Sequence, residues 1–227
     1  MDYNCGFWPD LWQLFKNELM QKVYFVAAIG TDIGKTFLVE NLCRILPNAT
    51  AIKPIASGFR EGDENSDSAK ILSALSLANS AENLNSITPW RFAEPVSPHF
   101  AGKINFDEVI DFCQKKISQA KGANKILFIE AAGGVMTPIN YEKTFLDVAA
   151  ELKISVLLVS ANYLGAISHT LCAVEVLKAR GVVVEKIILN DELPTAVKAT
   201  KELVQTLKDF GGVDVVLMAD FLNGGFF

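Results

Sequence analysis

Short apolar runs alternate along the chain with longer segments in which apolar residues recur every three or four positions. The runs at 22–29, 125–130, 153–160 and 185–190 are continuous, as is typical of parallel strands that are covered on both faces. Shorter runs at 50–55 and 213–218 are also predicted as strands. The pattern therefore predicts a largely buried sheet.

Helical periodicity fills the segments between these strands, at 35–46, 68–78, 105–120, 166–181 and 195–211. The last two segments end at glycines, which commonly stop helices. A polar loop is expected at 58–68. Regular alternation of strand and helix predicts an α/β fold, in which a doubly wound, mostly parallel sheet carries helices on both faces.

The first 19 residues stand apart from this single domain, which we assign to 20–227. Leu11, Trp12, Phe15 and Leu19 lie at helical spacing there. Two interpretations stay open: an upstream start, with Met20 opening the true domain, or an accessory helix that packs on the body or a partner. The excess of acidic residues disfavours a membrane-surface helix, and the stretch lacks the pattern of a secretory signal.

Composition is that of a soluble globular protein, with half of the 227 residues apolar and a net charge of -5. The acidic balance argues against nucleic acid as a partner, and no apolar run is long enough to span a membrane. Cys43, Cys113 and Cys172 fall in predicted helices, so we expect buried free thiols and a cytoplasmic protein.

The stretch "IGTDIGKT" at 29–36 joins the first strand to the first helix. It matches a phosphate-binding loop except that Ile29 replaces the first glycine of the motif. In such loops Gly34 lets the backbone approach a phosphate, Lys35 reaches the β- and γ-phosphates, and Thr36 can ligate Mg²⁺. We therefore expect nucleotide binding here.

Further polar residues follow other strands, at the sheet edge where doubly wound folds bind ligands. Lys53 follows the second strand, and taken alone it is most simply a solvated lysine. Glu130 ends a buried strand, where an unpaired carboxylate is costly, so we expect it to bind Mg²⁺. Asn190 and Asp191 end another strand and form either an adenine contact or a turn. The polar loop holds four acids, any one of which could bind a metal: Glu61, Asp63, Glu64 and Asp67.

Taken together, the motifs "GTDIGKT", "KPIASG", "NSD", "FAEPVSPH", "EAAGGVMTP" and "LGAISH" resemble the dethiobiotin synthetases in order and separation. The resemblance covers roughly 21–191. It implies an ATP- and Mg²⁺-dependent carbon–nitrogen cyclo-ligase of biotin synthesis, with the P-loop NTPase-like fold. The implied substrates are 7,8-diaminononanoate and CO₂, joined through a carbamate and a carbamic–phosphoric anhydride. The resemblance also implies a homodimer with the substrate near the interface.

The same resemblance implies a role for each matching residue. Lys53 and Lys35 are the implied catalytic lysines, and Asp67 and Glu130 join Thr36 as Mg²⁺ ligands. The implied nucleotide contacts are Asp32, Ile33, Gly34, Lys35, Thr36, Phe37, Asn190 and Asp191. The implied substrate contacts are Ser57, Gly133, Gly134 and, from the neighbouring subunit, Leu164, Gly165, Ala166, Ile167 and Ser168.

Three features depart from the family pattern. Ala131 stands where many members have glycine, the segment after the last strand lacks the usual proline, and the N-terminal extension has no counterpart. The first two leave the nucleotide specificity open. A rival of another class is a P-loop switch ATPase of the partitioning or site-selection kind, which usually carries a further lysine early in its loop. Ala28 and Ile29 occupy that region here.

Overall fold

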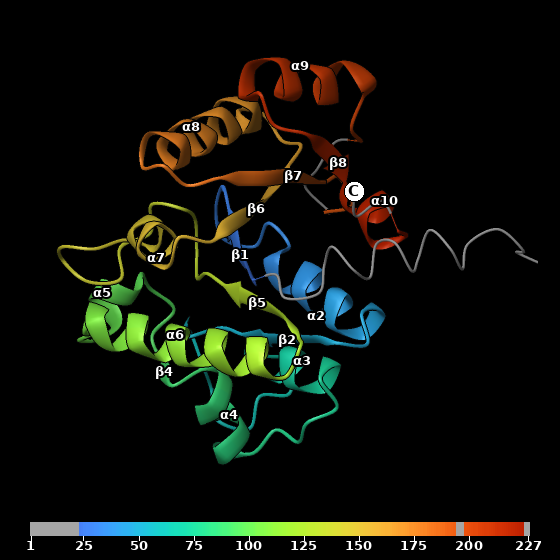
Figure 1. Cartoon of the computed structure of the whole chain (residues 1–227). Helices are drawn as coiled ribbons and strands as arrows, with labels where there is room; N and C mark the ends of the chain where they lie inside the picture. The colour runs from blue at the N-terminus through green and yellow to red at the C-terminus, as the bar shows by residue number, and fades with distance from the viewer. Residues whose placement is uncertain (1–22, 194–197, 225–227) are drawn as a thin grey trace, which may run out of the picture.

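The computed structural model describes residues 23–193 and 198–224. The predicted extension at 1–19 and Cys5 lie outside the described residues. Six strands form one parallel sheet in the order β2-β5-β1-β6-β7-β8, and two more form a small parallel sheet, β3-β4 (Figure 1). The strands are β1 Val23–Ala28, β2 Ala49–Ile52, β3 Ile55–Ser57, β4 Trp90–Phe92, β5 Ile126–Glu130, β6 Ser155–Ala161, β7 Val184–Asn190 and β8 Val215–Leu217.

Helices connect the strands and cover both faces of the main sheet, as the strand–helix alternation predicts (Figure 1). Helix α2 runs from β1 toward β2 and packs with α3 and α10. The later connections run in the opposite direction across the sheet, from β2 toward β8, and carry α6, α7, α8 and α9. Helix α6 packs with α7, and α8 packs with α9. The helices are α2 Lys35–Ile45, α3 Asp67–Ala74, α4 Ala81–Ile87, α5 Pro98–Ala101, α6 Phe106–Gly122, α7 Phe145–Leu152, α8 Ala166–Ala179, α9 Lys201–Gly211 and α10 Met218–Leu222.

The core lies on both sides of the central strands. Every residue of β5 is buried, and so is every residue of β1 after Val23. Phe25 and Phe128 are among the largest side chains that are almost completely enclosed. A strand enclosed on both faces reads as a continuous apolar run, which is why the sequence pattern locates β1, β5, β6 and β7 well.

The carboxyl ends of the parallel strands meet at one edge of the sheet. The phosphate-binding loop follows β1, Lys53 follows β2, and Glu130 and Asn190 end β5 and β7. Since all described pairings within the sheet are parallel, four segments far apart in the sequence are brought to the same edge. The fold thus assembles the candidate residues in one place.

The strand predicted at 50–55 is wrong in its extent, because the chain forms two strands there. Pro54 has no N–H to donate to a ladder, and the segment leaves the main sheet at this point. The Lys53 N–H bonds to the Ile87 carbonyl at 3.1 Å, and the Trp90 N–H bonds to the Pro54 carbonyl at 3.1 Å. Ile55 then opens β3, which pairs with β4 in the small sheet.

Two other predictions need correction. The helix predicted at 195–211 begins at Lys201, after Thr200, whose side chain accepts a hydrogen bond from the Leu203 N–H; residues 194–197 lie outside the described part. Cys43 and Cys113 are buried free thiols as expected, but Cys172 is exposed on α8. Periodicity alone left the orientation of α8 undetermined, because this helix is apolar around most of its circumference.

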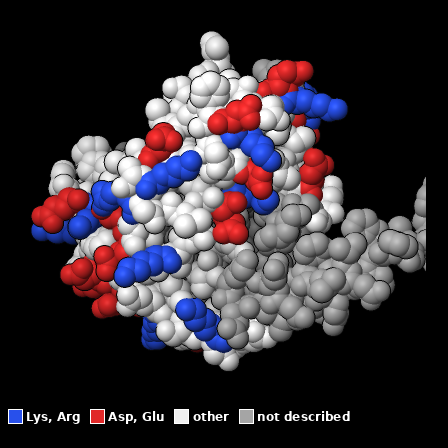
Figure 2. All heavy atoms as spheres, turned by 45° about the horizontal axis from the view of Figure 1, so that its top comes forward, with Lys and Arg blue, Asp and Glu red and all other residues white. Residues whose placement is uncertain are grey.

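The surface is mixed in charge. On the face shown in Figure 2, acidic and basic side chains are interspersed, in keeping with the modest net charge of -5. None of the helices within 23–193 and 198–224 is long and apolar enough to cross a membrane.

Helix α7 anchors the loop that follows β5 through a capping box. The Thr144 N–H and hydroxyl both donate to Asp147 Oδ2, each at 2.8 Å, and Asp147 Oδ1 pairs with Arg180. The Phe145 N–H bonds back to the Thr137 carbonyl at 3.1 Å. Burial would raise the pKa of Asp147, but the Thr144 hydrogen bonds and Arg180 hold it below its usual range.

We predict that Asp147→Asn lowers the free energy of unfolding by about 1 kcal/mol at pH 7, because the charged acceptor of the capping box is lost. A carboxylate with a depressed folded pKa stabilises the fold above its unfolded pKa, near 3.9, and loses that contribution as the pH falls through the folded value. Urea denaturation should therefore show the wild type and the variant converging below about pH 4. Arg180→Ala, which keeps the capping hydrogen bonds, should cost about 0.5 kcal/mol or less. A pH-independent difference between wild type and Asp147→Asn would contradict this account.

Candidate active site

The phosphate-binding loop depends on a contact with the end of β7, two strands away from β1 in the sheet. Gly34 adopts φ +105°, and a Cβ placed on it would lie 2.4 Å from Asn190 Nδ2. That amide donates to the Ile33 carbonyl at 3.0 Å, while its oxygen accepts from the Glu192 N–H at 3.2 Å. Only glycine satisfies both the left-handed backbone and the close amide. The end of β7 thereby holds the loop in shape.

Lys35 opens α2 and is almost completely buried. Its ammonium donates to the Gly30 carbonyl at 2.9 Å, so the loop closes on itself. Burial lowers the pKa of Lys35 to about 8, although Glu130 favours the charged form and Lys53 disfavours it. A phosphate placed in the loop would be a far better partner for this ammonium than a single carbonyl.

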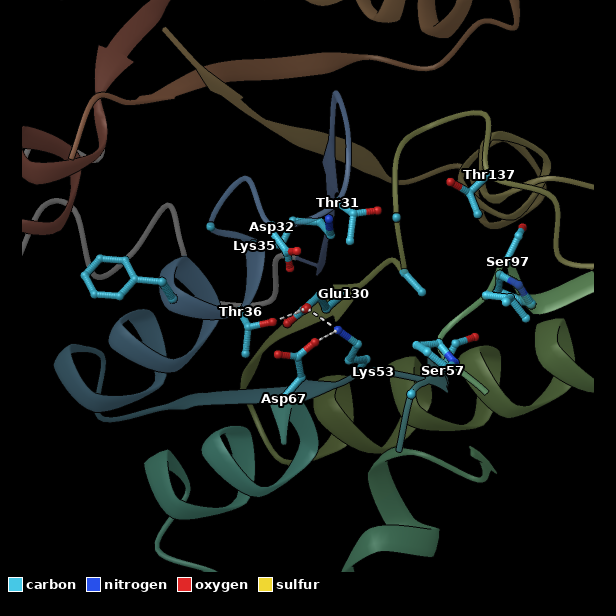
Figure 3. A pocket seen from close by; sticks show the side chains of 18 of the residues that line it. Thr31, Asp32, Lys35, Thr36, Lys53, Ser57, Asp67, Ser97, Glu130 and Thr137 are labelled. Carbon is cyan, nitrogen blue, oxygen red and sulfur yellow. Dashed lines mark hydrogen bonds and ion pairs between the residues drawn. The ribbon is translucent and has the colours of Figure 1, made fainter. Parts of the chain in front are cut away.

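Lys53, Asp67 and Glu130 form one ionic cluster, with Thr36 beside it (Figure 3). The Lys53 ammonium donates to Glu130 Oε1 at 2.8 Å and to Asp67 Oδ2. Thr36 Oγ1 donates to the same Glu130 oxygen at 2.6 Å. Lys53 and Glu130 are 5% and 0% exposed, whereas the Asp67 side chain opens into the cavity. Lys53 is therefore a buried ion-pair partner rather than a solvated lysine.

The pKa values in this cluster follow from its charges. Burial would lower the pKa of Lys53, but Glu130 and Asp67 outweigh burial and raise it, so that the side chain stays protonated. Burial would likewise raise the pKa of Asp67, but the neighbouring ammonium lowers it, so that the carboxylate stays charged.

Thr36, Asp67 and Glu130 offer a donor set that suits Mg²⁺. Within residues 23–193 and 198–224, no three His, Cys, Asp or Glu side chains are grouped so that they could hold a metal. Mg²⁺, however, is usually held by one or two carboxylates together with water and phosphate oxygens. Glu130 Oε2 is buried and has no hydrogen-bond partner, which leaves a hard oxygen ready for a cation. These residues therefore fit the ion that the sequence motifs imply.

A cavity of about 820 Å³ extends from the loop past this cluster (Figure 3). Its far wall carries hydroxyl groups, and Ser57 Oγ is buried there without a partner. Gly133 lies against the Thr137 side chain, whose hydroxyl accepts from the Gly134 N–H at 2.8 Å. Gly134, predicted as a substrate contact, is not among the lining residues. The residues that line the cavity are Thr31, Asp32, Gly34, Lys35, Thr36, Phe37, Lys53, Ser57, Gly58, Asp67, Lys70, Pro95, Val96, Ser97, Pro98, Glu130, Ala132, Gly133, Thr137, Pro138 and Leu193.

Other predicted residues lie away from the cavity wall. Ile33 packs in the core, and Asn190 and Asp191 are buried behind the loop, where Asp191 accepts from the Ala199 N–H. Asn190 uses one N–H and one lone pair on the protein, which leaves one of each for a nucleotide base. The adenine contact thus stays a prediction that this geometry permits.

The segment 164–168 also does not line the cavity. Leu164 is completely exposed, and Gly165, with φ +96°, directly precedes the first residue of α8. Ala166 is buried, whereas Ile167 and Ser168 face outward. None of these five residues is among those that line the cavity in the described part of the chain, so their contact with substrate from a neighbouring subunit stays a prediction.

Ala131 does not crowd the phosphate site. Its side chain is completely buried, and its N–H bonds to the Val26 carbonyl at 3.0 Å. The neighbouring Ala132 is the residue that faces the cavity. The methyl group at 131 therefore belongs to the core, and the departure from glycine has no direct effect on the cavity.

Sequence reasoning missed several residues of the cavity wall, among them Lys70, Ser97 and Thr137. Lys70 lies three residues after Asp67 on α3, so helical spacing places both on the same face, a signal that was available. Ser97 is the N-cap residue of the short helix α5, and Thr137 lies in the loop after β5, where no periodicity marks which side chains point inward.

Comparisons with known proteins agree with the motif series. A family model described as an AAA domain matches residues 22–220. The chain is 40% identical to an ATP-dependent dethiobiotin synthetase BioD of Acidiphilium cryptum, across 79% of this chain and 85% of that one. It is 34% identical to the protein of the same name from Methylobacterium nodulans, across 89% and 94%.

Solved structures show the fold alone. A ParA family ATPase of Chlorobium tepidum superposes with a TM-score of 0.54 at 14% identity, across 90% of each chain. The Aquifex aeolicus MinC:MinD cell division complex gives a TM-score of 0.54 at 15% identity, across 90% of this chain and 86% of that one. Such distant likeness confirms the P-loop NTPase-like architecture and does not assign an activity.

We predict that Gly34→Ala abolishes measurable ATP binding, because the added methyl would displace the Asn190 amide and distort the loop. Gly62→Ala is the matched control: Gly62 also has a positive φ, +76°, but a Cβ there would meet nothing within 4 Å. The control should lose about 1 kcal/mol of stability from backbone strain and keep its ATP affinity. Calorimetric titration with ATP distinguishes the two, and equal affinities in both variants would contradict the role given to the Asn190 contact.

Proposed function

Since the chain belongs to the ATP-dependent dethiobiotin synthetase family, we propose that it joins CO₂ to 7,8-diaminononanoate in an ATP-driven ring closure. As a member of that family it is an ATP-dependent ligase of biotin biosynthesis. The observation that carries the detailed proposal is the convergence of two buried lysines and two carboxylates on one cavity beside the phosphate-binding loop.

The proposed reaction has three steps. One substrate amine adds to CO₂ and loses a proton, which gives a carbamate. A carbamate oxygen then attacks the γ-phosphorus of ATP, forming a carbamic–phosphoric anhydride and releasing ADP. The second amine attacks the carbonyl carbon and loses a proton, phosphate leaves with the bonding electrons, and the ureido ring closes.

The residues supply positioning and positive charge, which are what phosphoryl transfer chiefly needs. Lys35 and the backbone of the loop hold the β- and γ-phosphates, and Lys53 offers its charge to the carbamate and the transferred phosphoryl group. Thr36, Asp67 and Glu130 would hold Mg²⁺, which neutralises charge on the phosphate oxygens when bound.

The far wall of the cavity is proposed to hold the diamine. Ser57 has a buried hydroxyl without a partner, which a substrate group could satisfy. Gly133 lines the same space and is proposed to contact the substrate. Gly134 lies behind it and donates its N–H to the Thr137 hydroxyl, so its proposed role is to hold that hydroxyl in place.

We further propose a homodimer in which the neighbouring subunit completes this site. The exposed apolar side chains of Leu164 and Ile167 support a contact there, as does the exposed N-terminus of α8. That terminus would offer backbone N–H groups to the carboxylate of the substrate. The free thiols of Cys43, Cys113 and Cys172 fit a reducing, cytoplasmic setting.

We predict that the purified protein releases phosphate from ATP and Mg²⁺ only when bicarbonate and 7,8-diaminononanoate are both present. Coupled phosphate detection together with mass spectrometry of the product measures this directly. Phosphate release that does not depend on the diamine but increases with DNA or vesicles would favour a switch ATPase instead. Failure to form dethiobiotin would refute the ligase proposal.

We also predict that Lys53→Met lowers kcat on the order of 10²–10³-fold, because an ammonium that stabilises transition-state charge is lost. Lys121→Met makes the same chemical change on the exposed end of α6 and should keep wild-type kinetics. Lys53→Met with an unaltered kcat would exclude Lys53 from the reaction, whatever its effect on KM.

A further inference from the structure

The ammonium of Lys53 lies among the groups assigned to bind the metal. It pairs with Glu130 Oε1 at 2.8 Å and with Asp67, and the Thr36 hydroxyl donates to the same Glu130 oxygen. The positive charge at the point where the three proposed Mg²⁺ ligands converge is thus supplied by the Lys53 side chain (Figure 3).

The Lys53 ammonium and a divalent ion compete for the same two carboxylates. Two carboxylates face one ammonium, so the cluster carries a net negative charge, and Glu130 Oε2 has no partner. With Mg²⁺ bound, the two carboxylates would be neutralised, and the ammonium would lie within a few ångströms of a dication. Like charges at such distances repel strongly inside a protein.

We propose that Lys53 acts as a place-holder for Mg²⁺, and that its ammonium leaves Asp67 and Glu130 for the cavity when the ion binds. This inference rests on the proposed Mg²⁺ ligands but not on the identity of the organic substrate. It makes metal binding and the positioning of the catalytic lysine a single event.

The backbone restricts this movement to the side chain. The Lys53 N–H is bonded to the Ile87 carbonyl, and the following Pro54 has a fixed φ and a carbonyl bonded to the Trp90 N–H. The Lys53 side chain borders the cavity, and Ser57 lines the same cavity four residues on. Rotation about the lysine side-chain bonds is therefore sufficient to bring the ammonium to an anionic group bound there.

The device also imposes an order on the reaction. Before the metal binds, Lys53 is neutralised by two carboxylates and has little charge to offer a carbamate or phosphate. After the metal binds, those carboxylates are occupied and the ammonium is released to pair with the anionic substrate. Lys53 therefore becomes available to the substrate only in the metal-loaded site.

The test uses Mg²⁺ alone, without ATP or diamine, so its failure would leave the proposed reaction standing and the failure of that reaction would not affect it. In calorimetric titration, Lys53→Met should bind Mg²⁺ at least about tenfold more tightly than the wild type, because the competing ammonium is gone. Lys70→Met removes an exposed cation that lines the same cavity but makes none of the hydrogen bonds of the cluster, and should change the affinity by less than about threefold. Equal affinity in Lys53→Met and wild type, or an equal gain in Lys70→Met, would overturn the proposal.

A second measurement on the wild-type chain remains decisive if Lys53→Met does not fold. Acetylation of lysines followed by mass spectrometry should show Lys53 protected in NaCl and modified several-fold faster at equal ionic strength in MgCl₂. Lys70, exposed in both conditions, serves as the internal reference. An unchanged ratio of Lys53 to Lys70 modification would show that the ammonium does not leave its carboxylates, and the proposal would be wrong.

Discussion

The ion pair between Lys53 and Glu130 is the constraint around which the rest of the site is arranged. A carboxylate with no exposed surface cannot stay charged without a nearby cation, and a buried ammonium has the converse need. Removing either partner would strand a charge inside the protein. The pair therefore ties the end of β5 to the end of β2, and Asp67 ties α3 to both.

This arrangement explains why the candidate site can be built from strand ends. Parallel strands deliver their last residues to one edge, and the enclosed strands behind them fix those residues in place. The loop after β5 is likewise fastened, by the capping box of α7. Phosphoryl transfer gains chiefly from such fixed positioning, because it needs little covalent chemistry from the protein.

The gathering of candidate residues at one edge of the sheet could be predicted from the sequence, because it follows from local patterns and from a general rule of parallel sheets. Continuous apolar runs marked the strands, and the residues that follow them could be placed together without knowledge of the detailed packing. What could not be predicted depends on tertiary contact. The strands β3 and β4 span three residues each, too short for any period to register, and Pro54 breaks a run that looked continuous.

The same limit applies to individual side chains. The exposure of Cys172 depends on which face of a broadly apolar helix turns outward, and Ser97 and Thr137 point into the cavity from irregular backbone. The burial of Ala131 away from the phosphate site follows from its hydrogen bond to Val26 on the neighbouring strand. None of these facts is encoded in spacing along the chain, because each depends on a partner that is distant in sequence.

The contact between Asn190 and the phosphate-binding loop has a consequence for folding during translation. The loop is complete early in translation, but the amide that supports it is 157 residues from its bonding partner, Ile33. A nascent chain that has emerged only through β5 already carries the whole phosphate-binding motif and lacks this support. The loop can thus reach its final hydrogen-bonded shape only after β7 has left the ribosome and joined the sheet.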